Sequence, residues 1–395
     1  MRITDLRELS VPLRGNIANA LVNFSEHTVS LVAVCTDQVR DGRPVVGLAF
    51  DSIGRFAQGG LLRERFLPRL RAAAPESLLD ASGQRFDPAA VLRTLMRNEK
   101  PGGHGDRAAA VGAVELAFWD LNAKLAGEPA WQTIARHFGT TAHRDGVPVY
   151  AAGGYYYPEG SGHSLGDELR GYRDQGYRRY KIKIGGAPLA QDLRRIEEAL
   201  AVAGGDGGCI AVDANGRFDL PTALDYARAL APLRLRWIEE MGDPLDYALN
   251  AALAQAYGGA IATGENLFSL ADVRNLLRFG GMRPGLDVFQ MDPGLSYGLV
   301  EYGRMLAAMA EAGFAPTQAQ PHGGHLINLH VVAGLGLGGC EAYPGVFEPF
   351  GGYSAACRVS EGRLSPSDAP GFGLEQKREL QEPLRELLAG TGAAS

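Results

Sequence analysis

The segment "YKIKIGG" (residues 180–186) has the alternation of a β-strand, with Lys181 and Lys183 on one face and Ile182 and Ile184 on the other. Similar short apolar runs recur along the rest of the chain, separated by stretches with helical character. The predicted strands are residues 147–151, 180–185, 209–214, 236–240, 260–265, 287–292, 316–321 and 339–343. Strands that alternate with helices in this way predict an α/β fold, a closed parallel (β/α) barrel.

Polar side chains fall at the ends of six successive predicted strands. They are Lys183, Asp213, Glu239, Glu265, Asp292 and His322, and 30, 26, 26, 27 and 30 residues separate them in turn. Each interval is one βα unit, so a closed barrel brings all six to its C-terminal face, where barrel enzymes keep their chemistry. An open doubly wound sheet would spread them along one edge instead.

The rest of the chain indicates a second domain. The 395 residues exceed the usual size of a single core. The first 50 residues read as strands, with a hairpin turn at Asp41 and Gly42, and helical patterns follow. The predicted helices are residues 60–75, 88–98 and 106–126. We therefore predict an α+β domain over residues 1–140, the barrel over 146–355, and a C-terminal segment, 356–395, that packs back on the first domain.

Charge and composition exclude several classes of protein. The formal net charge is -6 and no long basic run occurs, which argues against nucleic acid as a partner. The N-terminus lacks the apolar centre of a signal peptide, and no apolar stretch approaches about 18 residues, so we expect a cytoplasmic protein with no membrane partner. The 4 cysteines form no CxxC pair, which favours ordinary buried thiols.

Asp213, Glu239 and Glu265 each close an apolar run, in "AVDAN", "RWIEE" and "ATGEN". A single acid at such a place is usually solvated or caps a helix. Three in register form a cluster of hard oxygen donors, which requires a cation and suits octahedral Mg²⁺. Of the neighbours Glu239 and Glu240 only one can face the barrel axis, and the spacing selects Glu239.

Two lysines on one strand face indicate a base. A lysine acts as a base only when neutral, and its ordinary pKa of about 10.4 leaves little neutral form at pH 7. A second ammonium and a divalent cation nearby both lower that pKa. We therefore interpret Lys183 as the base and Lys181 as the residue that tunes it; the alternative is a pair of lysines at a solvated sheet edge. His322 follows Asp292 in the strand register by one βα unit, so Asp292 is a candidate to orient its ring.

Together these residues resemble the enolase superfamily, in its branch of proteins like mandelate racemase and muconate lactonizing enzyme. The likeness spans nearly the whole chain and includes "ELAFWDLNAKLAGEP" (115–129), the KxK motif, the three carboxylates, the Asp292 and His322 pair and "PGFGLE" (370–375). Four stretches are most similar to D-tartrate dehydratases: "NEKPGGHG" (98–105), "AAGGYYYP" (151–158), "MGDPLDYAL" (241–249) and "PHGGH" (321–325). The resemblance implies a modified TIM barrel of the (β/α)7β type with an α+β N-terminal capping domain, which the C-terminal segment completes.

The resemblance also implies further site residues. Glu341, in the last predicted strand, would contact the substrate carboxylate or its ene-diolate; a buried structural acid is the alternative. Lys100 would reach the site from the first domain. The loop of residues 16–24, with Asn19, would cover the barrel mouth, and Asn215 is a further candidate for substrate binding.

The reaction that the resemblance implies is a Mg²⁺-dependent loss of water from a hydroxy-carboxylate. Lys183 would remove the α-proton, Mg²⁺ on the three carboxylates would hold the ene-diolate, and His322 with Asp292 would protonate the departing β-hydroxyl. The product is a 2-keto acid, which is oxaloacetate if the substrate is D-tartrate. Another aldaric or aldonic acid stays open as substrate, as does racemisation or epimerisation of a 2-hydroxy acid. The usual assembly of the family is a homo-oligomer.

Two motifs indicate other classes of protein. "GLSYG" (294–298) matches the nucleophile elbow of serine hydrolases, but His322, His325 and His330 precede the next acid, Glu341, which is the wrong order for that fold. We interpret His325 and His330 as packing or loop residues. "GLGLGG" (334–339) matches a dinucleotide-binding turn, but it ends a predicted helix and leads into a strand, so its glycines fit close packing. The remaining alternative is an inactive binding protein on the same scaffold.

Overall fold

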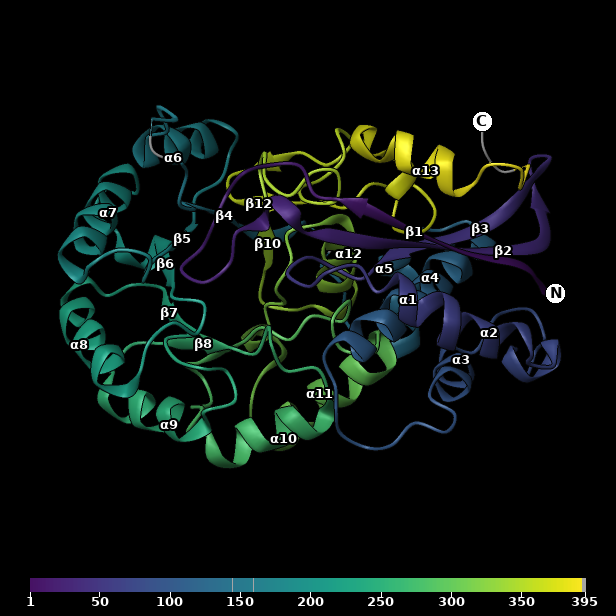
Figure 1. The fold of residues 1–395 in the computed structure, drawn as a ribbon, viewed down its shortest axis with the longest axis horizontal. Coiled ribbons are helices and arrows are strands. Elements are labelled where there is room, and N and C mark those ends of the chain that lie inside the picture. Colours follow the sequence, from purple (N-terminus) through teal and green to yellow (C-terminus); the bar gives the residue numbers. More distant parts are fainter. Residues whose placement is uncertain (144, 159, 393–395) are drawn as a thin grey trace.

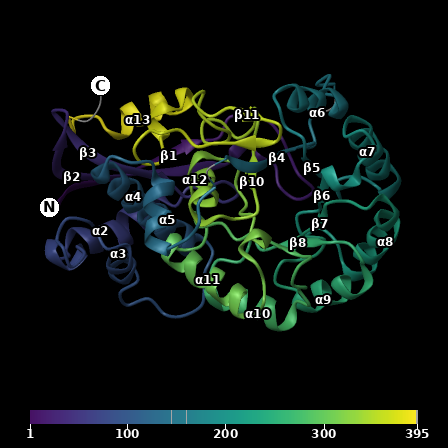
Figure 2. The ribbon, with the colours of Figure 1, turned by 180° about the vertical axis from the view of Figure 1, so that it is seen from behind.

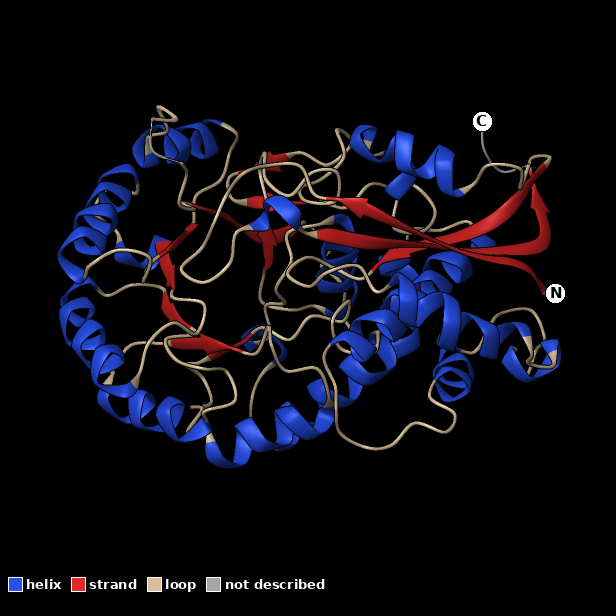
Figure 3. Cartoon of the chain, viewed as in Figure 1, coloured by secondary structure: helices blue, strands red, loops and turns tan. Residues whose placement is uncertain are grey.

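The computed structural model describes residues 1–143, 145–158 and 160–392. Figure 1 shows a ring of short strands inside an arc of helices and, beside it, a long three-stranded sheet with helices on both of its sides. Figure 3 separates the two kinds of element, with the helices of the arc outside the strands of the ring. The predicted fold class, an α/β barrel with an α+β capping part, is confirmed.

The capping part begins with an antiparallel sheet in the order β1-β2-β3. Asp41 and Gly42 join β2 to β3 with φ angles of 51° and 77°, as in a tight hairpin turn of the predicted kind. The sheet packs against the long helix α4. The elements are β1 (Ile3–Pro12), β2 (Thr28–Arg40), β3 (Arg43–Phe50), α1 (Gly59–Leu61), a π-helical turn (Leu62–Phe66), α2 (Leu67–Arg71), α3 (Pro88–Leu95), α4 (Asp106–Ala126) and α5 (Ala130–Phe138).

The barrel strands are parallel and follow one another around the ring in chain order. They are β4 (Val147–Gly153), β5 (Tyr180–Lys183), β6 (Ile210–Asp213), β7 (Trp237–Glu239), β8 (Ile261–Thr263), β9 (Val288–Phe289) and β10 (Cys340–Ala342), which pairs with β4 and closes the ring. The surrounding helices are α6 (Leu165–Asp174), α7 (Leu189–Val202), α8 (Leu220–Leu230), α9 (Tyr247–Ala256), α10 (Leu270–Phe279), α11 (Leu299–Glu311) and α12 (Leu326–Leu335). Several begin at a side chain that accepts a backbone N–H, as Asp219 does for α8 and Ser269 for α10.

The predicted strand at residues 316–321 is wrong. Pro316–Gln318 forms a 3₁₀ turn, and only a single bridge, between Ala319 and Phe289, follows it. Prolines at 316 and 321 supply no backbone N–H, so the segment cannot form a regular ladder. The N–H groups of Gln320 and His322 still bond to the carbonyls of Phe289 and Gln290, at 2.8 and 3.1 Å, so the segment keeps its place in the ring.

The C-terminal segment packs back on the capping part through residues 371–375 and through its last helix. β11 (Val359–Ser360) and β12 (Arg363–Leu364) form a hairpin that pairs with β4 of the barrel. α13 (Gln381–Leu387) then lies against β1, and Figure 2 shows it from behind beside the three-stranded sheet. The segment therefore contacts both parts of the molecule.

Buried carboxylates of α4 join the parts of the molecule. Glu115 accepts the N–H of Leu299, the first residue of α11, at 2.8 Å. Asp120 accepts the N–H of Phe372 in the C-terminal segment at 2.6 Å. Both acids belong to the run "ELAFWDL", so this motif serves the assembly of the fold.

The loop between β1 and β2 reaches the barrel. Ala18 and Tyr156 exchange backbone hydrogen bonds of 3.0 and 2.7 Å, and Tyr156 lies in the loop after β4. In Figure 1 this purple loop extends across the strands of the ring. In the described part of the chain, no helix has the length and apolar character needed to cross a membrane.

Candidate active site

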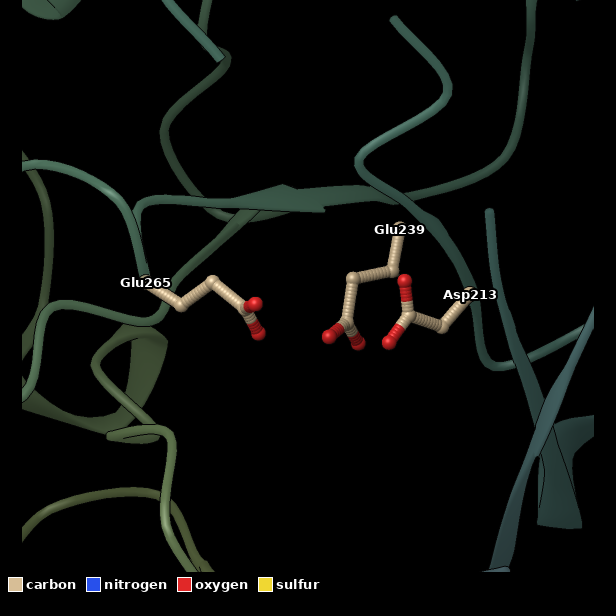
Figure 4. A group of neighbouring side chains, drawn as sticks. All are labelled: Asp213, Glu239 and Glu265. Atoms are coloured by element: carbon tan, nitrogen blue, oxygen red, sulfur yellow. The ribbon is translucent and has the colours of Figure 1, made fainter. Parts of the chain in front are cut away.

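Three carboxylates meet at the C-terminal ends of β6, β7 and β8. One oxygen from each of Asp213, Glu239 and Glu265 lies within 4.8 Å of the other two. Figure 4 shows Glu265 facing the other two across a gap, with all three carboxylates directed at the same space. An octahedral Mg²⁺ with ligands at about 2.1 Å holds opposite oxygens roughly 4.2 Å apart, so the spacing fits one ion.

Burial makes this cluster costly without a cation. The side chains of Asp213 and Glu239 are fully buried. Burial and the charges of Asp213 and Glu265 outweigh the attraction of Lys181 and raise the pKa of Glu239 to about 8. The oxygen donors and the crowding of negative charge are what a divalent metal ion requires, and we call Asp213, Glu239 and Glu265 the acidic triad.

The two lysines of β5 lie at this triad as the alternation predicts. The Nζ of Lys183 donates to Oδ2 of Asp213 at 2.5 Å, and the Nζ of Lys181 lies 2.6 Å from Oε1 of Glu239. Burial lowers the pKa of Lys183, but the Asp213 carboxylate outweighs burial and holds it above its ordinary value. This direction is opposite to our prediction, because Asp213 touches Lys183 and its effect exceeds that of Lys181.

His322 lies at the other end of the triad, with Nε2 4.0 Å from Oε2 of Glu265. Its Nδ1 is 3.2 Å from Oδ2 of Asp292, so the predicted pair is in contact. Burial alone would lower the pKa of His322, but Glu265 and Asp292 outweigh burial and raise it to about 9. The structure thus brings an amine and an imidazole to the two outer carboxylates of the triad.

Sequence reasoning missed Ser52, which supports Asp292 from the capping part. The Oγ of Ser52 donates to Oδ2 of Asp292 at 2.5 Å and lies 3.0 Å from Nε2 of His325. Ser52 follows β3 with a φ of 61°, which is rare for a residue with a side chain, and nothing in the local sequence indicates it. His325 lies at the start of α12, where its Nδ1 accepts the N–H of Asn328. Through its contact with Ser52 it also belongs to this hydrogen-bond network.

Glu341 is buried and has partners at both oxygens. Oε1 lies 2.7 Å from Nζ of Lys181, and Oε2 accepts from the N–H of Gly323 and from Oη of Tyr343, at 2.9 and 3.0 Å. These contacts fit the alternative of a buried structural acid. Tyr343, whose Oη is also 3.2 Å from Nε2 of His322, was missed. Strand alternation from Glu341 could have found it.

The three other residues that we predicted to bind substrate each have a different environment. Asn215 donates from Nδ2 to Oδ2 of Asp213 at 3.2 Å, so it orients a triad residue. Asn19 accepts the N–H groups of Leu21 and Val22 and closes a turn in its loop. The side chain of Lys100 is exposed, and within the described ranges only its backbone carbonyl has a hydrogen bond, from Arg107.

The two competing motifs are structural. Ser296 of "GLSYG" is buried and donates to the backbone carbonyl of Asp292 at 2.6 Å, so its hydroxyl is not poised as a nucleophile. "GLGLGG" ends α12 and leads into β10, as predicted. A Cβ on Gly338 would lie 1.9 Å from the carbonyl oxygen of Thr317, so close packing requires glycine there.

Comparison with known proteins identifies the family. The family model described as "Enolase C-terminal domain-like" matches residues 135–380. The 3,6-anhydro-alpha-L-galactonate cycloisomerase of Streptomyces coelicolor is 32% identical over 286 residues, which are 69% of this chain and 70% of that protein. The L-talarate/galactarate dehydratase of Salmonella typhimurium is 30% identical over 301 residues, 71% of this chain and 66% of the relative.

A solved structure shows the same fold over nearly the whole chain. It is described as a racemase from Streptomyces coelicolor A3(2) with bound magnesium, and it is 24% identical to this chain. The TM-score is 0.75, with 97% of this chain and 98% of the other covered. Because the family model spans most of the barrel and the relatives match beyond it, the chain belongs to the enolase superfamily, in its branch that includes proteins like mandelate racemase.

Proposed function

We propose that this protein is a Mg²⁺-dependent acid-sugar dehydratase, which removes water from a hydroxy-carboxylate to give a 2-keto acid. The observation that carries the proposal is the position of Lys183 and His322 at the two outer carboxylates of the acidic triad. The likeness to the L-talarate/galactarate dehydratase supports it. So does the arabinonate dehydratase of Saccharolobus solfataricus, 27% identical over 69% of this chain and 71% of that protein.

Asp213, Glu239 and Glu265 are the residues that would hold the metal. When bound there, Mg²⁺ supplies positive charge for the substrate carboxylate and for the negative charge that develops as the α-proton leaves. Trp237 donates from Nε1 to Oε2 of Glu239 at 2.8 Å, and Asn215 donates to Asp213. These donors fix the orientation of the two acids, as outer partners of metal ligands do.

The proton transfers fall to Lys183 and His322. Lys183 is the proposed base for the α-proton, since Asp213, whose contact raises the pKa of Lys183, would serve as a metal ligand in the loaded site. Lys181, paired with Glu239 and Glu341, is the proposed tuning residue beside it. His322 is the proposed acid that protonates the departing β-hydroxyl, because the Asp292 carboxylate at its Nδ1 favours the protonated ring. Asp292 is a positioning residue that orients the ring of His322.

We further propose D-tartrate as the substrate, with oxaloacetate as the product. This step rests on the four sequence stretches that are similar to D-tartrate dehydratases. Two of them lie beside the site, since "PHGGH" carries His322 and "AAGGYYYP" carries Tyr155, over whose ring the Nζ of Lys183 lies at 5.3 Å. The cytoplasmic location and the homo-oligomeric state stay predictions from the sequence.

The test is a screen of the purified protein with Mg²⁺ against tartaric, aldaric and aldonic acids. We expect a 2-keto acid from D-tartrate and no product when a chelator is present. Incorporation of solvent deuterium at carbon 2 without loss of water from any acid would show a racemase or epimerase instead. Formation of a 2-keto acid from a different acid would keep the reaction and replace the substrate.

A further inference from the structure

The loop that follows β3 covers the His322 side of the triad. Ser52 of this loop bonds to Asp292. Two residues later, a Cβ placed on Gly54 would lie 3.8 Å from Cε1 of His322, so the backbone at Gly54 lies close to the imidazole. The next residue, Arg55, therefore stands at the rim of the site, on the capping part.

The guanidinium of Arg55 is held at that rim by two contacts. Nη2 donates to Oδ1 of Asn266 at 2.8 Å, and Asn266 directly follows the triad residue Glu265. Cζ lies 4.8 Å from the centre of the Phe268 ring, a cation–π contact. These contacts hold a half-buried cation against the loop after β8, next to the triad residue Glu265 in sequence.

No acid neutralises this cation in the part of the chain that the structure describes. Its one side-chain hydrogen bond is to the neutral amide of Asn266. A guanidinium has five N–H donors in a planar fork that matches the two oxygens of a carboxylate. The free donors of Arg55 can therefore receive a carboxylate without displacing an ion pair.

We propose that Arg55 binds a second carboxylate of the substrate, so that the site selects dicarboxylic hydroxy acids over monocarboxylic ones of the same configuration. This inference rests on the proposed function, because it takes the acidic triad and its metal as the site of the first carboxylate. An aldonic acid has a neutral hydroxymethyl group where the dicarboxylic acid has its second charge. It cannot form the bidentate pair with Arg55.

The test measures binding, so it does not depend on turnover. Calorimetry with the full chain and Mg²⁺, in a Lys183→Met background that prevents reaction, compares matched ligands. One pair is D-tartrate and the trihydroxybutanoate of the same configuration, and the other is a hexaric acid and the corresponding hexonic acid. We expect tighter binding of the dicarboxylate in at least one pair, by about 10- to 100-fold, the effect of one charge-assisted interaction.

Arg55→Gln should remove that preference by weakening only the dicarboxylate, and Arg55→Lys should keep part of it. The matched control is Arg217→Gln, because Arg217 is exposed on the loop after β6, at the same face of the barrel but on the Lys183 side. This control should keep the preference.

Equal weakening of both ligands by Arg55→Gln would overturn the inference, as would a preference that survives the substitution or is absent from the parent. Failure of the proposed function gives a different result. In that case the wild-type protein eliminates water from neither member of a pair, while the dicarboxylate still binds more tightly.

Discussion

The two sides of the acidic triad differ in how they are built. Lys183 comes from β5 and contacts Asp213 and the ring of Tyr155, all from the barrel. His322 also comes from the barrel, but the loop after β3 holds its partner Asp292 through Ser52 and lies close to its ring. The direct partners of the proposed base thus come from the barrel, and the capping part only packs Phe24 against Tyr155 behind them. On the side of the proposed acid, the capping part bonds directly to Asp292.

This difference separates two tasks of the site. Removal of an α-proton beside a metal-bound carboxylate requires the same base and the same charge stabilisation for any hydroxy acid. The leaving hydroxyl and the far end of the substrate vary between acids. When a loop of the capping part recognises these groups, the substrate specificity can change while the barrel residues stay the same.

Lys183→Met should have the largest effect. Loss of a general base lowers kcat by about 10²- to 10⁴-fold, and no other described amine touches Asp213 at hydrogen-bond distance. Exchange of the α-proton with solvent deuterium should disappear together with formation of the 2-keto acid, as followed by NMR. An unchanged circular dichroism spectrum and melting temperature would establish that the fold is intact. Retained exchange in this variant would contradict the role of Lys183.

His322→Asn should separate the two sides. We expect elimination to fall by about 10²-fold or more, because the departing hydroxide loses its acid, while exchange of the α-proton persists on the Lys183 side. The measurement is the ratio of deuterium incorporation to keto-acid formation in one reaction mixture. If both rates fall equally, the two sides are coupled and the comparison fails.

The sequence was sufficient to predict which carboxylates meet at the mouth of the barrel. Asp213 and Glu239 each close a short apolar strand, and the constant length of a βα unit places such ends side by side. The strand predicted at 316–321 does not form, because Pro316 and Pro321 supply no backbone N–H to a ladder.

Contacts between distant segments could not be predicted in the same way. Ser52 and Arg55 lie in a loop whose polar composition resembles that of any solvated turn, and only the folded chain places them beside Asp292 and Asn266. The sequence does carry a signal for the hairpin of β11 and β12, namely Gly362 after Glu361, because glycine suits a tight turn. The structure has φ angles of 46° and 70° at these two residues.

Addition of Mg²⁺ should stabilise the protein through the acidic triad. A metal ion at about 100 times its Kd adds roughly 2.7 kcal/mol to the free energy of unfolding, which a thermal melt detects. Glu265→Gln should reduce this gain at the same Mg²⁺ concentration, because one ligand loses its charge. The control is Glu311→Gln, which removes an exposed charge at the end of α11. An equal response to Mg²⁺ in the two variants would exclude Glu265 as a ligand.

Ser52→Ala should have the smallest effect of these substitutions, and it acts on the His322 side alone. We expect kcat for elimination to fall by about 10-fold with little change in KM, because Asp292 keeps its contact with His322 but loses the donor that fixes its carboxylate. The matched control is Ser296→Ala, which removes a buried hydroxyl that bonds to the backbone carbonyl of Asp292 and leaves its carboxylate untouched. Exchange of the α-proton should stay at the wild-type rate in both variants. A loss of exchange in Ser52→Ala that equals the loss of elimination would show that the capping part supports both sides, and the division of labour between barrel and cap would be wrong.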